Sequence, residues 1–289
     1  MRIVYVAKHG SGGNDDEGAI AHALSKLGHT VIPVQESAGE SATKIVDADF
    51  CLFHKWDDFA SIGRLKVPAV FWYFDLVEYN DTTLNRRNED RRRWMRRAID
   101  FTLAQFCTDG DWAEKKGLCH LPQGADERLV GMEAVGPPSR VLMTASQRGG
   151  QGRDSFFQFV TRKVRNLVWH KSGLHGADLR KAVAASAAVI APQHPCTDRY
   201  WSNRVYLILG FGGILLHPAT VGLADHFTHE HDILYYSSHK DFLEKLEYAQ
   251  NLTDEQSMRM RVNAIDTIQT AHLYRHRCEK LVELVKERL

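Results

Sequence analysis

Short apolar segments rich in β-branched and aromatic residues alternate with longer amphipathic segments along the chain. The first apolar segment, 2–8, precedes 16–27, where apolar residues recur at helical spacing and Gly28 supplies a typical helix end. A regular alternation of strands and helices is typical of parallel sheets. The pattern therefore predicts an α/β protein that opens with a strand–helix–strand unit.

The alternation predicts two sheets separated at residues 131–139, where Gly136-Pro137-Pro138 can continue neither a helix nor a central strand. We expect Rossmann-like parallel-sheet lobes at 1–135 and 139–271, and a final helix at 272–289 that packs back on the first lobe. The first lobe should hold strands at 2–8, 30–34, 50–54, 69–74, 101–106 and 118–121. The second should hold strands at 140–145, 167–170, 189–192, 213–217 and 233–236, with helices at 155–165, 177–185, 203–209, 239–251 and 254–271.

The composition changes this picture little. The 289 residues suffice for two α/β domains, and 44% hydrophobic against 25% charged residues is a globular balance. The apolar runs are shorter than the ~20 residues of a membrane span, and the N-terminus lacks signal-peptide features. The five cysteines form no C-x-x-C pair, which favours reduced thiols over a disulfide or zinc framework. We expect a cytoplasmic protein without a membrane partner. Because the net charge is only +1, any polyanionic partner would have to bind to a local basic patch.

The most informative motif spans residues 198–218. Its polar start ends in Ser202-Asn203, an N-cap signal, so the helix that begins near Arg204 offers free N–H groups to a diphosphate. The guanidinium group of Arg204 adds positively charged donors for a phosphate oxygen. A Gly-Gly turn ending at Gly213 lets the chain bend into the next strand. An ordinary helix–turn–strand with a surface arginine has the same spacing, so both interpretations stay open on these residues alone.

This motif resembles the C-terminal signature of CgeB-like, spore-protein-type glycosyltransferases, in which Asn/Ser-x-Arg opens a helix that ends in a Gly-Gly turn. The similarity extends to His272-x-Tyr274-x-x-Arg277, which matches the closing motif of the family. It implies the GT-B fold, with a cleft between the two lobes, a nucleotide-sugar bound by the C-terminal lobe and an acceptor presented by the N-terminal lobe. One position departs from the family, which usually has a ribose-binding glutamate where this chain has Leu207. Either another polar residue, for example within 193–198, takes that role, or donor binding has changed or been lost.

A glycine-rich loop at 146–153 follows the first strand of the second lobe. It lies at the carboxyl edge of the predicted sheet, where open α/β folds bind ligands, and its Arg148 and Arg153 are candidate phosphate ligands. A flexible surface turn is the structural alternative. No Walker motif is present in the sequence.

The matching loop of the first lobe, 9–15, carries His9, Gly10 and Gly12, which we expect to face the acceptor. It is an incomplete G-x-G-x-x-G, since Asp15 stands where the third glycine belongs. With Glu36 near the end of the second strand, a dinucleotide-dependent oxidoreductase remains a second interpretation.

Asp75 follows the apolar aromatic run 71–74 at the carboxyl end of a strand. A carboxylate flanked by aromatic side chains can have a raised pKa, which suits a base that removes the proton of an acceptor hydroxyl. Capping of the next turn is its structural alternative, and His9 and His54 are reserve candidates for the base.

Two further segments carry charged patterns. Asp109-Gly110-Asp111 is similar to a metal-binding Asp-x-Asp, although Asp-Gly is also a common turn. Residues 86–97 are dense in arginine, Arg93 among them, which fits either a solvated helix or a surface that follows a phosphate backbone.

We therefore expect a glycosyltransferase (hexosyltransferase) that moves a sugar from a nucleotide-sugar, with a UDP-sugar as first candidate and no required metal. Asp75 is the expected base. The arginine-dense segment favours a hydroxymethylated pyrimidine in duplex DNA as acceptor, as in bacteriophage DNA modification. A small-molecule, protein or cell-surface acceptor, and a non-catalytic nucleotide- or sugar-binding module, are the alternatives. The expected donor-binding residues are Arg148, Arg153, Ser202, Asn203, Arg204 and Gly213, and the expected acceptor-binding residues are His9, Gly10, Gly12 and Arg93.

Overall fold

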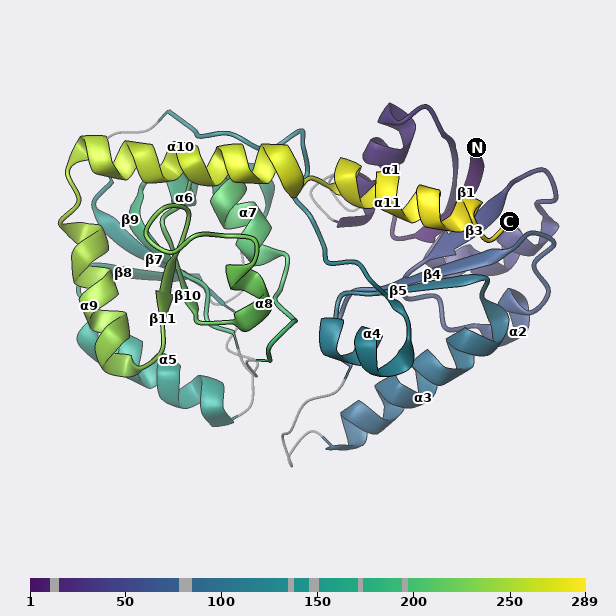
Figure 1. Cartoon of the computed structure of the whole chain (residues 1–289), viewed down its shortest axis with the longest axis horizontal. Helices are drawn as coiled ribbons and strands as arrows, with labels where there is room; N and C mark the ends of the chain where they lie inside the picture. The colour runs from purple at the N-terminus through teal and green to yellow at the C-terminus, as the bar shows by residue number, and fades with distance from the viewer. Residues whose placement is uncertain (11–15, 78–84, 135–137, 146–150, 171–173, 194–196) are drawn as a thin grey trace. The chain divides into compact units, whose positions relative to one another are not determined.

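The structure is a computed structural model that describes residues 1–10, 16–77, 85–134, 138–145, 151–170, 174–193 and 197–289, without the side chains of 85–88 and 151–154. The chain forms two compact units (Figure 1). Unit 1 comprises Met1–Asp126 together with Tyr274–Leu289, and unit 2 comprises Glu127–Leu273.

Unit 1 is built on a parallel sheet in the order β2-β1-β3-β4-β5-β6. The order reverses between β1 and β3, which in open α/β sheets opens a crevice at the carboxyl ends of those strands. The strands are β1 (Arg2–Ala7), β2 (Thr30–Gln35), β3 (Phe50–Phe53), β4 (Ala69–Tyr73), β5 (Ala104–Cys107) and β6 (Cys119–His120). The strand predicted to begin at residue 101 begins at Ala104 instead, because Phe101 still belongs to helix α3.

One face of this sheet is covered by α1 (Asp16–Lys26) and α11 (Tyr274–Lys286), which lie side by side (Figure 1). Ile20 and Leu24 of α1 share a buried cluster with Leu281 and Val285 of α11. The predicted return of the C-terminal helix to the first lobe is thus confirmed.

The other face is covered by α2 (Phe59–Ile62), α3 (Asn85–Phe101) and α4 (Gly110–Lys116), with the 3-10 segment η1 (Glu36–Lys44) at one side. Buried Trp56, Met95 and Trp112 fill the space between these elements and the sheet. The sequence patterns did not predict η1, α2 or α4, because segments this short show no clear apolar periodicity.

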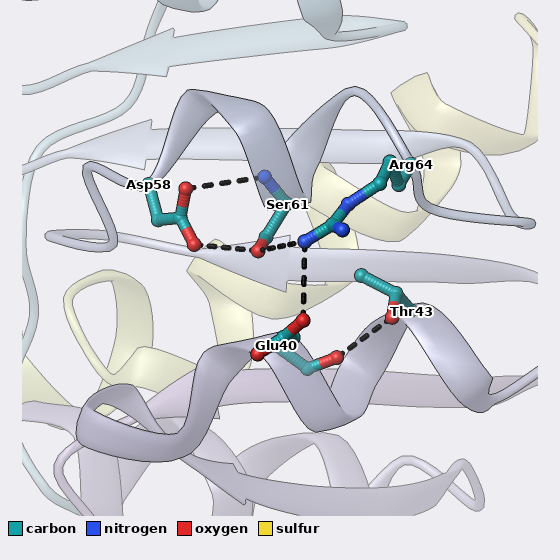
Figure 2. Close-up of polar contacts among 5 residues, drawn as sticks. All are labelled: Glu40, Thr43, Asp58, Ser61 and Arg64. Carbon is teal, nitrogen blue, oxygen red and sulfur yellow. Dashed lines mark hydrogen bonds and ion pairs between the residues drawn. The ribbon is translucent and has the colours of Figure 1, made fainter.

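A polar network joins η1 to α2 (Figure 2). Asp58 caps α2 by accepting from the backbone N–H of Ser61 at 3.2 Å, and hydrogen bonds from Ser61 hold the pKa of its carboxyl below the ordinary value. Arg64 donates to the Ser61 hydroxyl at 3.1 Å and to Glu40 at 3.2 Å. Thr43 donates to the Glu40 carbonyl at 2.8 Å, so these contacts fix the two short elements to each other.

Unit 2 is built on a second parallel sheet in the order β11-β10-β9-β7-β8. Here the strand order reverses between β7 and β9. The strands are β7 (Arg140–Thr144), β8 (Leu167–His170), β9 (Ser186–Ile190), β10 (Leu215–Pro218) and β11 (Leu234–Tyr236). The helices are α5 (Gln151–Lys163), α6 (Gly176–Ala184), α7 (Arg204–Gly210), α8 (Val221–Ala224), α9 (His239–Gln250) and α10 (Asp254–Ala271). Among the helices within these described ranges, none has both the length and the apolarity needed to span a bilayer.

The break between the units lies at Asp126/Glu127, ahead of the proline-containing segment at which the sequence placed it. Residues 127–134 belong to unit 2 because they make hydrogen bonds with its helices. Gly131 N–H donates to the Gly210 carbonyl at 2.8 Å, and Glu133 accepts from Arg180 at 2.7 Å. These long-range contacts have no local signature in the sequence.

Candidate functional site

Arg204 is held at the carboxyl edge of the unit 2 sheet. It begins α7, and its guanidinium donates to the carbonyl of Thr144 at 2.6 Å and to the Ser202 hydroxyl at 3.3 Å. Thr144 is the last residue of β7, one of the two strands between which the order reverses. The predicted phosphate-binding arginine therefore lies where open α/β sheets bind ligands.

Two further polar groups lie at this edge. The Thr144 hydroxyl is buried and makes no hydrogen bond with the described part of the chain. His217, in β10, is 1% exposed, and its Nδ1 lies 2.8 Å from the Pro218 carbonyl. Burial lowers the pKa of His217 to about 4, with a smaller contribution from the charge of Arg204. The sequence analysis missed both residues, although each is a polar residue at the end of an apolar strand.

The remaining donor-site predictions have different structural positions. Asn203 is the N-cap residue of α7 but its side chain does not cap the helix, contrary to the expectation of an N-cap bond. Gly213 donates its N–H to the Ile208 carbonyl at 2.8 Å, and a Cβ there would collide with the Ile208 and Val183 side chains. Gly213 thus permits close packing of the turn. Arg148 lies outside the described residues, and of Arg153 only the backbone, in α5, is described.

At the carboxyl edge of the unit 1 sheet, His9 follows β1. Its Nε2 lies 2.9 Å from the Tyr5 carbonyl, and Gln35 donates to the His9 carbonyl at 2.6 Å. Gly10 has a φ of +88°, which favours glycine, and no atom of the described residues lies within 4 Å of the position of a Cβ. Gly12 lies outside the described residues.

The two other base candidates in unit 1 differ in exposure. Asp75 is exposed just beyond β4, although its neighbours Phe74 and Leu76 are buried. His54 is fully buried, with Nδ1 2.8 Å from the Trp72 carbonyl and Nε2 2.6 Å from the Tyr5 hydroxyl. Burial lowers the pKa of His54 to about 3. Because both ring nitrogens have protein partners, His54 is a structural residue and Asp75 remains the predicted base.

A pocket of about 450 Å³ lies between α3 and the segments that follow β3 and β4. Arg97 lies 4.5 Å above the Phe59 ring centre, and Arg93 pairs with Asp90 at 3.3 Å. Arg91 donates to the Leu76 carbonyl at 2.7 Å. Four cationic and two acidic residues line the pocket together with three aromatic ones: Lys55, Arg91, Arg93, Arg97, Asp57, Asp90, Phe59, Tyr73 and Trp94.

Asp109 of the Asp-x-Asp segment caps α4. Its carboxylate accepts from the N–H groups of Trp112 at 3.0 Å and Val77 at 2.9 Å, and the residue is 2% exposed. Asp111 lies in the first turn of α4. The described residues contain no group of three or more His, Cys, Asp or Glu arranged to hold a metal ion.

The closing His-x-Tyr-x-x-Arg motif makes contacts within each unit. Tyr274 donates to Asp16 at 2.6 Å and Arg277 donates to the Gln123 carbonyl at 3.1 Å, both in unit 1. Burial, reinforced by the Asp16 carboxylate, raises the pKa of Tyr274 well above its ordinary value. His272 is buried against Phe227, with ring centres 4.8 Å apart, in unit 2. The motif therefore anchors the start of α11.

Comparison with known proteins bears on both units. The profile of a family described as glycosyl transferase-like matches residues 150–283. The chain has the GT-B fold of glycosyltransferases, and its similarity to the glycosyl transferase-like family covers a little under half of its length. Sucrose-phosphate synthase from Thermosynechococcus elongatus is similar with a TM-score of 0.71 at 9% identity, over 99% of this chain and 98% of that chain. No curated protein matches the sequence.

Two other similar solved structures contain a nucleotide. Anabaena Alr3699/HepE in complex with UDP has a TM-score of 0.64 at 11% identity, over 99% of this chain and 100% of that chain. T4 phage BGT in complex with UDP and Mn²⁺ has a TM-score of 0.64 at 10% identity, over 99% of both chains. These likenesses confirm the predicted GT-B fold of the chain, and the finer resemblance to CgeB-like proteins stays a prediction.

Proposed function

We propose that this protein is a glycosyltransferase, which transfers a hexose from a UDP-sugar bound by unit 2 to a hydroxyl of an acceptor bound by unit 1. The observation that carries the proposal is Arg204, held by Thr144 at the carboxyl end of β7 where the strand order reverses. The UDP in the Anabaena and T4 phage structures, and UDP-glucose in a second Anabaena complex, support the choice of donor.

The transfer breaks the bond between the sugar and the diphosphate and forms one to the acceptor oxygen. Arg204 would stabilise the negative charge that develops on the departing nucleotide diphosphate, aided by Arg148 and Arg153. Asp75 would accept the proton of the acceptor hydroxyl. This scheme assigns the stabilisation of the leaving group to cationic side chains and requires no metal.

For the acceptor we propose a hydroxymethylated pyrimidine in duplex DNA. The support is the pocket beside α3, where arginines and aromatic rings combine charge for phosphates with surfaces for a base. His9, Gly10 and Gly12 would complete the acceptor side. The resemblance in fold to T4 phage BGT is compatible with this acceptor. A small-molecule, protein or cell-surface acceptor is the alternative.

Calorimetry with UDP and UDP-glucose tests the donor site. The parent protein should bind both, and Arg204→Ala should weaken binding at least about tenfold, the effect of losing a charge-assisted contact of roughly 1.5–3 kcal/mol. Arg162→Ala on the exposed end of α5 is the matched control and should leave affinity unchanged. Equal affinities for the parent and Arg204→Ala would remove Arg204 from the site.

Turnover separates an enzyme from a non-catalytic nucleotide- or sugar-binding module, the alternative suggested by Leu207. UDP release from UDP-glucose should rise on addition of hydroxymethylated duplex DNA and not of unmodified DNA. The same assay with EDTA or added Mn²⁺ tests the metal independence of the scheme. Tight donor binding without turnover on any acceptor would support the module instead.

A further inference from the structure

The hydrogen-bond chemistry of His217 is fixed by its surroundings. Its Nδ1 lies 2.8 Å from the Pro218 carbonyl, and a carbonyl can only accept, so Nδ1 carries the hydrogen. Burial keeps the pKa of His217 at about 4, so the ring is neutral near pH 7. In a neutral ring with hydrogen on Nδ1, Nε2 has a lone pair and no hydrogen. His217 is therefore an acceptor at Nε2.

This acceptor has no protein donor in the part of the chain that the structure describes, where Nδ1 makes the only hydrogen bond of the ring. The Thr144 hydroxyl is buried and also has no hydrogen-bond partner among the described residues. Unpaired polar groups in a buried site cost free energy, and in native structures they often await a ligand or water. Two such groups at one sheet edge indicate a site that a ligand completes.

Arg204 links the two groups. It donates to the Thr144 carbonyl, and its charge acts on the His217 ring. Strand β9 separates β7 from β10, so their ends lie about 10 Å apart, a distance that one nucleotide-sugar can span. Leu207, one turn along α7, is apolar and cannot supply an acceptor.

We propose that Nε2 of His217 accepts a hydrogen bond from a sugar hydroxyl of the bound nucleotide-sugar and so positions the donor beside Arg204. The inference rests on the proposed function. Phosphate oxygens are acceptors and cannot pair with this nitrogen. The donors of a UDP-sugar that flank its diphosphate are the hydroxyls of the ribose on one side and of the hexose on the other, whereas the uracil N–H lies beyond the ribose. The shared ligand chemistry is a hydroxyl group, and the two sources are separable.

Paired deletions in protein and ligand test the proposal. His217→Asn keeps an amide near Nδ1 to donate to Pro218 and removes the acceptor, whereas His217→Gln restores a polar group near Nε2. The ligands are UDP, 2′-deoxy-UDP, 3′-deoxy-UDP, UDP-glucose and its singly deoxygenated glucose analogues. The parent should bind one of the deoxy ligands roughly three- to tenfold more weakly than its full counterpart. His217→Asn should lose that discrimination, and His217→Gln should recover part of it.

The deoxy ligand whose weaker binding depends on His217 identifies the hydroxyl that donates to Nε2. A deoxy-UDP would identify a ribose hydroxyl, and a deoxy-glucose analogue would identify a hexose hydroxyl. A parent that binds neither UDP nor UDP-glucose would overturn the proposed function and this inference together. A parent that binds UDP-glucose, with a His217→Asn variant that discriminates against every deoxy ligand as the parent does, would overturn this inference alone.

Nitrogen NMR of the parent gives a second measurement that needs no stable Asn variant. Two-bond proton–nitrogen spectra should show His217 with hydrogen on Nδ1, assigned by the loss of its signals in His217→Gln. Nε2 should move upfield when UDP-glucose binds, because it then accepts a hydrogen bond. An Nε2 signal that does not move at saturating UDP-glucose would contradict the proposal.

Discussion

Single residues determine which groups are free to act at the two sheet edges. Thr144 and His217 each leave a polar atom without a partner among the residues that the structure describes, whereas both nitrogens of His54 have partners. Asp75 is exposed two residues after the end of β4, a strand whose residues are all buried. The chemistry proposed for the molecule follows from these differences in partnering.

Asp75→Asn should abolish sugar transfer while leaving UDP-glucose affinity nearly unchanged. The amide keeps the shape of the carboxylate but cannot take up the acceptor's proton, and loss of a general base typically costs 10²- to 10⁴-fold in rate. Turnover with saturating acceptor and calorimetry with UDP-glucose give the two values. Asp100→Asn, exposed near the end of α3 and not among the residues that line the pocket, is a control. Turnover of Asp75→Asn within a few-fold of the parent would place the base elsewhere.

The two buried histidines predict a loss of stability in mild acid. Their pKa values, about 3 for His54 and about 4 for His217, lie below the ordinary 6.5, so the unfolded chain takes up protons first as the pH falls. Stability is fully present above pH 6.5 and should fall by about 2 kcal/mol per histidine at pH 5. Urea unfolding at pH 7.5, 6 and 5 measures this. An unfolding free energy that is flat over this interval would contradict the buried neutral state of both rings.

Among the candidate site residues, sequence reasoning found Arg204 because its type and place before a helix suit a phosphate. It missed Thr144 and His217 because only the tertiary structure shows that their polar atoms have no partner in the described part of the chain. The Asp-x-Asp segment had the composition of a metal site, yet Asp109 is a buried helix cap. Residue type indicates chemistry, but partners determine whether it is available.

Secondary-structure elements were likewise predicted where their signal is local and missed where they depend on tertiary contacts. Strands such as β8 and helices such as α10 were predicted closely because apolar periodicity is a local property. Short α2 and α4 depend on the caps Asp58 and Asp109 and on burial of Phe59 and Trp112. The caps are local, but the burial of Phe59 and Trp112 depends on contacts with distant parts of the chain, so the sequence pattern did not reveal these helices.

Helix α3 should give the protein a salt-dependent affinity for duplex DNA. Each arginine–phosphate contact contributes about 0.9 to the slope of log affinity against log salt, so replacing Arg93 and Arg96 by Gln should flatten the slope by about 2. These two are chosen because Arg91 and Arg97 also contact the Leu76 carbonyl and the Phe59 ring within unit 1. Arg162→Gln with Lys163→Gln on α5 is the control pair. An unchanged slope after the α3 substitutions would leave these arginines as a solvated helix face.

Helix α11 should be essential for the stability of unit 1. Leu281→Ala removes a fully buried side chain from the cluster shared with α1 and should lower the unfolding free energy by about 2–5 kcal/mol. Glu283→Ala, on the exposed side of α11, should change it by less than about 0.5 kcal/mol. Chemical denaturation of the two variants gives the comparison. Equal stabilities would mean that α11 packs only loosely.

At the scale of the whole molecule, the chain enters unit 1, leaves it for unit 2 and returns. The excised segment 127–273 contains its complete sheet and core, so it should unfold cooperatively in urea. The segment 1–126 lacks α11 and should not unfold cooperatively on its own. Addition of a peptide of residues 274–289 should restore cooperative unfolding. The same peptide with Leu281→Asp is the control. Cooperative unfolding of 1–126 alone would show that α11 is dispensable for folding.

The late position of α11 also orders events on the ribosome. Synthesis proceeds from the N-terminus, and domains generally fold as they emerge. The face of unit 1 that receives Leu281 and Val285 stays open until the ribosome has passed those codons, after all of unit 2 has been made. A nascent chain therefore exposes this apolar surface for most of its translation. A truncated mRNA that lacks the α11 codons would yield a protein whose exposed apolar surface chaperones and proteases can recognise.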